Sequence, residues 1–259
     1  MHLHHLNCMT FHLGVQSVTH CLLIETDEEL ILIDTGLGLR DYANPTRLVR
    51  TLIAINRIPC DLEETAVRQV VRLGFAPDDV QHIVLTHLHA DHAGGLSDFP
   101  WAKVHVFAPE YEAAMNPRRF SFFERFYVAA HWAHGPEWVS HSLEGEQWFG
   151  LHCVRVIRGH SYEVLLIPLV GHSRGHCGVA VKTPEGWLLH CGDAYVRHSQ
   201  VDPYHPRSPF PSWIGPLERR LFPFEPLSRL RALVRDHGEE VQLFCAHDPH
   251  AFSRLRGSD

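Results

Sequence analysis

Four side chains that can bind a metal ion lie within six residues of one another, in residues 86–92 (THLHADH). In extended backbone, residues two apart point to the same side, so His87 and His89 can bind one cation together. A turn after His89 would direct Asp91 and His92 toward a second cation. Imidazole nitrogen and carboxylate oxygen suit zinc, and also iron or manganese. The run therefore predicts part of a two-metal centre.

Two metal ions need more ligands than these four, and a sheet can supply them because it brings its strand ends together. His172, Asp193 and His247 each follow an apolar run by one or two residues. Together with the first four, they make five histidines and two aspartates. This number fits two open coordination spheres, with Asp193 as the bridge between them.

Seven short apolar runs predict the strands that carry these residues. They are residues 29–33, 82–86, 103–107, 163–170, 178–183, 187–191 and 241–245. Residues 184–186 (PEG) predict a hairpin between the fifth and sixth of these strands.

Three helices are expected between the strands, at residues 61–73, 119–134 and 226–237. The first begins with a capping pattern, Asp61 and Glu64, and ends at Gly74. The second is aromatic. The sequence contains no repeat and no linker, so we expect a single α/β domain over residues 1–259, with an aromatic helical insertion or cap at about 109–152.

The composition is that of a globular protein. Of the 259 residues 45% are apolar and 20% are charged, which excludes a disordered chain, a collagen and a coiled coil. The net charge of −7 argues against binding of duplex nucleic acid. Seven cysteines without a C-x-x-C pair predict reduced thiols, and no signal peptide or membrane span is visible. We therefore expect a cytoplasmic protein. The sequence leaves its oligomeric state open.

Five motifs, in order, resemble the metallo-β-lactamase superfamily. They are D-T-G at 34–36, H-x-H-x-D-H at 87–92, G-H-S-x-G-H at 171–176, G-D at 192–193 and the late His247. The match spans residues 29–248. The resemblance implies a four-layer αβ/βα sandwich, with two mixed sheets inside and helices outside.

The resemblance also implies which residues hold each metal ion. One ion would be held by three histidines, namely His87, His89 and His172. The other would be held by Asp91, His92 and His247, and Asp193 would bind both. Asp34 would orient a ligand histidine.

The implied chemistry is hydrolysis. Two divalent ions about 3.5–4 Å apart lower the pKa of a shared water toward about 7, so a metal-bound hydroxide can attack a carbonyl substrate. Asp91 binds metal through one oxygen and can move the proton with the other. The cofactors would be two divalent ions, zinc in the first place, with iron or manganese as alternatives.

The chain most resembles the lactonase-like branch, in the strand and turn at residues 30–38 and in residues 77–80, which precede the strand that carries the metal-binding motif. In that branch a tyrosine three residues after the bridging aspartate hydrogen-bonds the substrate carbonyl. Tyr195 follows Asp193 by two, so we expect it in this catalytic role, with ordinary packing as the alternative. His176 would pack beside the site. An aromatic cap implies a small-molecule substrate that is apolar or acyl-bearing.

The leading interpretation is a lactone or ester hydrolase, and several alternatives remain. A glyoxalase II-like thioesterase carries a C-terminal helical domain, whereas only 12 residues follow His247. A nucleic-acid phosphodiesterase conflicts with the acidic balance. A β-lactam hydrolase, a mononuclear iron persulfide dioxygenase and a non-catalytic metal-binding scaffold are the others.

Overall fold

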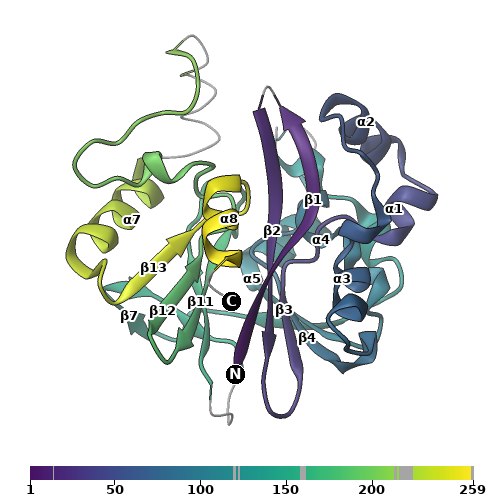
Figure 1. The fold of residues 1–259 in the computed structure, drawn as a ribbon, viewed down its shortest axis with the longest axis horizontal. Helices are drawn as coiled ribbons and strands as arrows, with labels where there is room; N and C mark the ends of the chain where they lie inside the picture. Colours follow the sequence, from purple (N-terminus) through teal and green to yellow (C-terminus); the bar gives the residue numbers. More distant parts are fainter. Residues whose placement is uncertain are drawn as a thin grey trace.

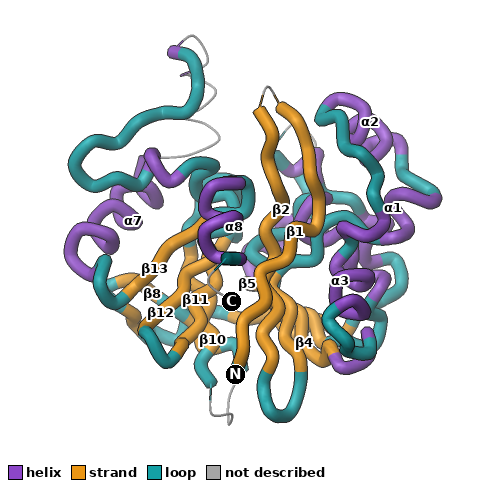
Figure 2. Tube along the Cα trace, in the orientation of Figure 1, coloured by secondary structure: helices purple, strands orange, loops and turns teal. Residues whose placement is uncertain are grey.

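Two β-sheets lie face to face, with helices on their outer sides (Figures 1 and 2). The structure is a computed structural model. It describes residues 1–257 except 14, 119, 120, 122, 158–161, 213, 214 and 216–223. None of the helices in this described part has both the length and the apolar character needed to cross a membrane.

The first sheet has six strands in the order β1-β2-β3-β4-β5-β6. They are β1 (His2–Leu13), β2 (Val15–Glu25), β3 (Leu30–Ile33), β4 (Val80–Val84), β5 (Lys103–Phe107) and β6 (Glu137–His141). The first three strands pair antiparallel, and β3 to β6 pair parallel. The sheet is therefore mixed, as expected.

The second sheet has five strands in the order β13-β12-β11-β10-β9. They are β9 (Val154–Arg155), β10 (Val164–Pro168), β11 (Cys177–Thr183), β12 (Gly186–His190) and β13 (Val241–Phe244). Only β12 and β13 pair parallel. A separate ribbon is formed by β7 (Gln147–Trp148) and β8 (Leu151–His152). All seven predicted strands are present, and Thr183 pairs with Gly186 across the predicted hairpin turn.

The described α-helices are short, apart from one near the C-terminus. They are α1 (Leu39–Ala43), α2 (Arg47–Ile55), α3 (Ala66–Arg72), α4 (Ala90–Ala93), α5 (Ala108–Met115), α7 (Phe224–His237) and α8 (Pro249–Arg256). Six 3-10 helices join them: η1 (Leu62–Glu64), η2 (Pro77–Asp79), η3 (Gly94–Asp98), η4 (Glu124–Phe126), η5 (Ala129–Trp132) and η6 (His198–Gln200).

Alternation along the strands builds three apolar layers, because successive side chains of a strand point to opposite faces. In β3, Leu32 packs in the outer layer with residues of α3, whereas Ile31 and Ile33 pack between the sheets. In β10, Leu166 faces between the sheets and Leu165 packs in the layer that includes α7. The α8 helix adds Ala251 and Leu255 to the middle layer and contacts β1 and β2 (Figure 1). The predicted four-layer sandwich is confirmed.

Two of the predicted helices differ from the structure. The predicted helix at 119–134 is wrong: residues 119, 120 and 122 lie outside the described residues, and the remainder forms two 3-10 helices, η4 and η5. The predicted helix at 61–73 begins at Ala66, because Asp61 caps the 3-10 helix η1 instead. Glu64 accepts hydrogen bonds from the backbone and hydroxyl of Thr10 in β1, so its carboxylate does not complete the expected helix cap.

The expected insertion at 109–152 is partly integral to the sandwich. Residues 137–141 form β6, which extends the first sheet by pairing with β5. Of the other described residues in this range, 124–126 and 129–132 form η4 and η5, and 147–152 form the β7–β8 ribbon apart from the two large sheets.

Candidate metal centre

All seven predicted metal ligands lie at one end of the sandwich, on the segments that follow strands. His87 and His89 lie between β4 and α4, and Asp91 and His92 lie in α4. The remaining three follow strands of the second sheet: His172 after β10, Asp193 after β12 and His247 after β13. The two sheets therefore contribute comparable shares of the candidate ligands.

The donor atoms form three overlapping groups. Within each group all donor atoms lie within 4.8 Å of one another, and the groups are His87–His89–His172, His87–His92–Asp193 and Asp91–His92–His247. The Asp193 carboxylate lies between the first group and the last. Its Oδ2 is 3.4 Å from His172 Nε2, and its Oδ1 is 3.0 Å from His247 Nε2 and 3.4 Å from His92 Nε2. This is the position that a bridging carboxylate needs.

Two buried imidazole nitrogens of this cluster, His87 Nε2 and His92 Nε2, have no hydrogen-bond partner among the described residues. Buried polar atoms are nearly always hydrogen-bonded, so two such atoms among clustered candidate ligands call for an explanation. Bound cations provide it, because imidazole and carboxylate donors suit zinc, iron and manganese.

The electrostatics differ between the two ends of the cluster. Although burial opposes the shift, the Asp193 carboxylate raises the pKa of His92 and of His247. Burial lowers the pKa of His89 and of His172 to about 3, although the Asp193 carboxylate opposes this shift. These imidazoles are therefore neutral near pH 7, which is the form that binds metal. Burial alone would raise the pKa of Asp193, but the imidazoles of His247 and His92 hold it well below its usual range.

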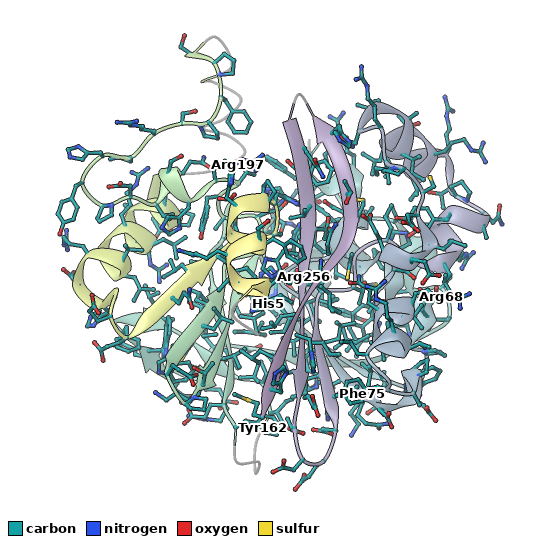
Figure 3. All side chains as sticks on the ribbon, viewed as in Figure 1. His5, Arg68, Phe75, Tyr162, Arg197 and Arg256 are labelled. Carbon is teal, nitrogen blue, oxygen red and sulfur yellow. The ribbon has the colours of Figure 1, made fainter. Side chains whose placement is uncertain are left out.

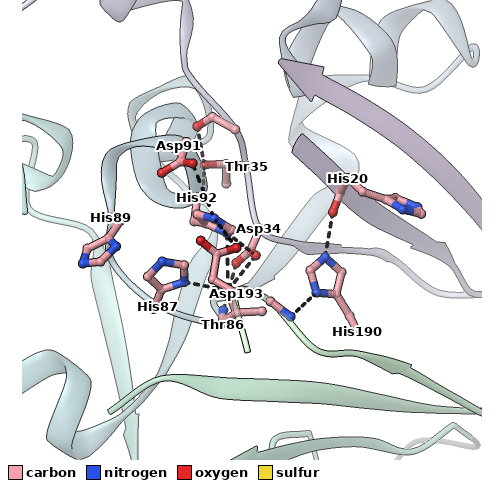
Figure 4. A network of polar contacts seen from close by, with 12 residues as sticks. His20, Asp34, Thr35, Thr86, His87, His89, Asp91, His92, His190 and Asp193 are labelled. Atoms are coloured by element: carbon pink, nitrogen blue, oxygen red, sulfur yellow. Dashed lines mark hydrogen bonds and ion pairs between the residues drawn. The ribbon is translucent and has the colours of Figure 1, made fainter. Parts of the chain in front are cut away.

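Asp34 fixes the orientation of His92, as Figure 4 shows. Its Oδ1 accepts a hydrogen bond from the Thr86 backbone nitrogen at 2.8 Å, and its Oδ2 accepts one from the Thr86 hydroxyl at 2.7 Å. The same Oδ2 lies 2.8 Å from His92 Nδ1. Asp34 has a φ of 56°, a conformation that aspartate tolerates better than most residues. The structure thus places Asp34 where it can hold Nε2 of His92 toward the other ligands.

His247 is oriented by the backbone of β2. Its Nδ1 lies 2.8 Å from the Val18 carbonyl oxygen and donates to it, which directs Nε2 toward the Asp193 carboxylate. Arg197, labelled in Figure 3, donates to the His247 carbonyl at 2.6 Å and to the Ser17 hydroxyl at 3.1 Å. The loop after β13 is therefore held to β2 on both sides of the ligand.

His176 holds the backbone of Asp193. Its Nδ1 donates to the Leu169 carbonyl at 3.0 Å, and its Nε2 accepts a hydrogen bond from the Asp193 backbone nitrogen at 2.9 Å. A Cβ atom at Gly192, where φ is 52°, would lie 2.6 Å from His176 Nε2. Glycine is therefore required beside Asp193, and His176 lies beside the centre as expected.

Sequence reasoning missed Glu110, which is fully buried at the start of α5. Its Oε1 accepts hydrogen bonds from the Leu88 backbone nitrogen at 2.9 Å and the Tyr127 hydroxyl at 3.0 Å. Its Oε2 accepts from the Ser173 hydroxyl at 2.6 Å and the Gly175 backbone nitrogen at 3.1 Å. Burial raises its pKa, and these hydrogen bonds oppose the rise.

The bonds of Glu110 join the two loops that carry the first ligand group. Leu88 lies between two of the ligand histidines, and Ser173 directly follows the third. A Cβ atom at Gly175 would lie only 2.0 Å from the Glu110 backbone nitrogen, so the loop after β10 approaches α5 as closely as a backbone can. The sequence signal was an acidic residue three positions after a strand, which by itself predicts nothing specific.

Tyr195 lies in the core. Its side chain is fully buried in the apolar layer between the second sheet and α7, with Cys191 and Cys245 in the same layer. Burial raises the pKa of the Tyr195 hydroxyl well above its usual range. This position favours packing over the expected contact with a substrate carbonyl.

Aromatic rings surround the ligand histidines. The ring of Phe123 lies 5.6 Å from that of His172, and the ring of Phe126 lies 5.7 Å from that of His89. Phe11 of β1 lies 5.1 Å from His247. A cavity of about 230 Å³ adjoins His172, with Arg118, Phe123, Glu124, Val170 and Arg174 in its walls. Apolar rings thus lie beside the histidines, whereas the walls of this cavity combine apolar and charged side chains, including an Arg174–Glu124 ion pair at 2.8 Å.

Comparison with known proteins gives the same picture. The family model described as "Metallo-beta-lactamase superfamily" matches residues 14–233. A probable metallo-hydrolase of Mycobacterium tuberculosis is 39% identical over 98% of this chain and 82% of its own length. The N-acyl homoserine lactonase AiiA of Bacillus thuringiensis subsp. kurstaki is 28% identical over 88% of this chain and 80% of its own length.

Solved structures share the fold. An N-acyl homoserine lactone hydrolase, solved with the product N-hexanoyl-L-homoserine at its catalytic metal centre, superposes with a TM-score of 0.68 at 22% identity. The match covers 97% of this chain and 95% of that structure. A probable metal-dependent hydrolase from Staphylococcus aureus superposes with a TM-score of 0.66 at 16% identity, over 95% and 89% of the two chains. The motifs, the fold and these relatives agree, and the chain belongs to the metallo-β-lactamase superfamily of hydrolases.

Proposed function

We propose that the protein is a dinuclear metal-dependent hydrolase that cleaves the carbonyl ester bond of an acyl-bearing lactone, or of a simple ester. The observation that carries the proposal is the position of Asp193, within 3.4 Å of His172 on one side and within 3.4 Å of His92 and His247 on the other. The two relatives of the lactonase type support the choice of a lactone.

Two divalent ions, zinc or alternatively iron or manganese, fit the donor set. His87, His89 and His172 would hold one ion, Asp91, His92 and His247 the other, and Asp193 both. When bound, such a pair lowers the pKa of a shared water toward neutrality and polarises a substrate carbonyl. Asp34 and Glu110 contribute by holding these side chains in place, so that little rearrangement accompanies binding.

Asp91 is the carboxylate best placed to hold a proton during turnover. Its side chain is 30% exposed, whereas that of Asp193 is 8% exposed and faces three imidazoles. Asp91 Oδ2 lies 3.5 Å from His247 Nε2 and 3.7 Å from His92 Nε2, so this oxygen lies on the ligand side. The exposure leaves the carboxylate open to the substrate side, where a leaving alkoxide needs a proton.

In our proposal the described residues 123–132, between α5 and β6, form the lid of this site. Phe126 and Tyr127 both lie against His89, at 5.7 Å and 5.3 Å between ring centroids, and Tyr127 bonds to Glu110. An apolar wall of this kind suits an acyl chain better than a charged group. We propose that this lid belongs to a single domain that spans the chain. The net negative charge of the chain makes nucleic acid a poor partner.

The substrate assay compares five chemistries on one preparation. Acyl-homoserine lactones of short and long chain, an aryl ester, a glutathione thioester, a chromogenic cephalosporin and a phosphodiester are offered to the metal-loaded protein. We expect turnover of the lactones and the aryl ester. Preferred turnover of the thioester or the phosphodiester would replace the proposal with the corresponding alternative.

A variant and a metal analysis test the mechanism. Asp91→Asn is expected to lower kcat about 10²–10⁴-fold, because the amide cannot accept the proton. Elemental analysis should give at least two equivalents of metal per chain, and Asp193→Ala should lower that number. Wild-type kcat in Asp91→Asn would remove this residue from the mechanism.

The cysteines bear on location. The thiols of Cys8, Cys21, Cys153, Cys177, Cys191 and Cys245 are free and buried. Free thiols suit a reducing compartment, so we propose a cytoplasmic location, which cell fractionation tests.

A further inference from the structure

A second group of metal-binding side chains lies at the open end of the β1–β2 hairpin, apart from the centre described above. It consists of His2, His4 and Glu25. His2 and His4 are two residues apart on β1, so they point to the same face of the sheet. The antiparallel register places Glu25, the last residue of β2, opposite His2 and diagonal to His4.

The donor atoms of this group have the spacing of a metal tripod. His2 Nδ1 lies 3.3 Å from His4 Nε2, and His4 Nε2 lies 2.8 Å from Glu25 Oε2. All three donor atoms lie within 4.8 Å of one another. Two ligands of a tetrahedral zinc ion, each about 2.0–2.1 Å from it, are about 3.3 Å apart. Small side-chain movements would therefore bring all three atoms to bonding distance of one ion.

The surroundings hold the tripod while leaving it open. The ring of His4 packs against Phe75, with 5.9 Å between ring centroids, and Figure 3 shows Phe75 at the same end of the molecule as the N-terminus. His4 and Glu25 are half-buried, whereas His2 is exposed. Asp27 and Glu28 follow in the turn after β2 and add negative charge. A cation would meet one half-buried imidazole, one carboxylate and one exposed imidazole.

We propose that His2, His4 and Glu25 form a separate binding site for a divalent transition-metal ion, with zinc as the probe. Imidazole and carboxylate ligands of this kind bind Zn²⁺, and also Ni²⁺ and Cu²⁺. The ion would fasten the first residues of β1 to the end of β2. This matters because β1 is the edge strand of its sheet, and exposed edges otherwise recruit other strands.

Zinc stoichiometry tests the proposal without relying on the hydrolase activity. Metal-free wild type, His4→Ala, Glu25→Gln and His12→Ala are dialysed against micromolar zinc and analysed for zinc per chain. His12 is an exposed histidine of the same strand, so His12→Ala is the matched control. We expect wild type and His12→Ala to retain one equivalent more than His4→Ala and Glu25→Gln. This difference in zinc content between wild type and variant does not depend on whether the catalytic centre holds one ion or two.

Hydrogen exchange and catalysis give independent readouts. Zinc should slow amide exchange at residues 2–6 and 21–25 in wild type and in His12→Ala but not in Glu25→Gln, a variant whose amide oxygen can still accept the hydrogen bond from His4. The kcat/KM of all four proteins should agree. Equal zinc content in wild type and Glu25→Gln, or the same loss in His12→Ala as in His4→Ala, would overturn the site.

Discussion

Replacement of Glu110 by glutamine is expected to weaken the protein and its first ligand group together. The carboxylate accepts four hydrogen bonds, two at each oxygen. Whichever way a glutamine amide turns, its nitrogen faces a backbone N–H, which loses its acceptor, and a hydroxyl, which must turn to accept; the remaining hydrogen bonds lose the charge of their acceptor. Hydrogen bonds to a charged group contribute about 1.5–3 kcal/mol each, and their loss leaves buried donors unpaired. We therefore expect Glu110→Gln to lower the free energy of unfolding by about 3–5 kcal/mol.

The assay for Glu110→Gln combines thermal unfolding with metal competition. For a chain of this size, about 3–5 kcal/mol corresponds to a fall in Tm of about 10 °C. Since the lost hydrogen bonds hold the loops of His87, His89 and His172, metal affinity should fall about 10- to 100-fold in competition with a chelator. Glu112→Gln, at an exposed position on the same helix, is the control and should change neither value. A wild-type Tm with unchanged metal affinity in Glu110→Gln would refute this reasoning.

Three further substitutions test other parts of the structure. Asp34→Asn should weaken metal binding about 10- to 100-fold, because the amide nitrogen favours the His92 tautomer that is protonated on Nε2; unchanged chelator competition would contradict this. Tyr195→Phe should leave kcat/KM within about twofold of wild type, whereas a large loss would restore the substrate contact. Burial raises the pKa of Asp98 to about 6, so its contribution to stability is complete below pH 4 and is lost as the pH rises through 6. Asp98→Asn keeps an acceptor for the Leu39 backbone nitrogen. In urea unfolding the variant should be more stable than wild type by about 1 kcal/mol at pH 7.5, a value reduced because Asp98 is partly exposed to solvent. The gain should be smaller at pH 5.

The ligand positions could be predicted because they depend on local signals that coincide. Each candidate ligand follows an apolar run that forms a strand, and both sheets end their strands on the same side. The pairing of β11 with β12 could also be predicted from a local signal, the short turn at 184–186. Motif spacing identified the remaining candidate ligands, because a residue one or two positions after a strand must lie close to the end of that strand.

The N-terminal hairpin could not be predicted, because its polar residues are buried in pairs. His5 and His20 are both buried and lie 2.8 Å apart between the sheets, so β1 and β2 do not show the alternation of an exposed hairpin. Burial and the neighbouring His5 and His190 lower the pKa of His20, so His20 stays uncharged near pH 7. Buried histidine pairs of this kind join residues that are far apart in sequence, so no local sequence pattern predicts them.

The predicted aromatic helix failed for a related reason. Phe123 and Phe126 do not form the stripe of a helix, because their rings lie against ligand histidines from two other loops. Glu110 was invisible because its four donors come from three separate segments. Contacts of this kind depend on tertiary structure alone.

The distribution of ligands over two sheets has a consequence for handling the protein. His87, His89, Asp91 and His92 are attached to the first sheet, whereas His172, Asp193 and His247 are attached to the second. Ions bound as proposed would clamp the two halves together, and their binding free energy would add to the resistance to unfolding. Purification in a strong chelator would then yield a chain whose halves separate at lower temperature, and an inactive preparation could reflect lost cohesion as much as lost chemistry.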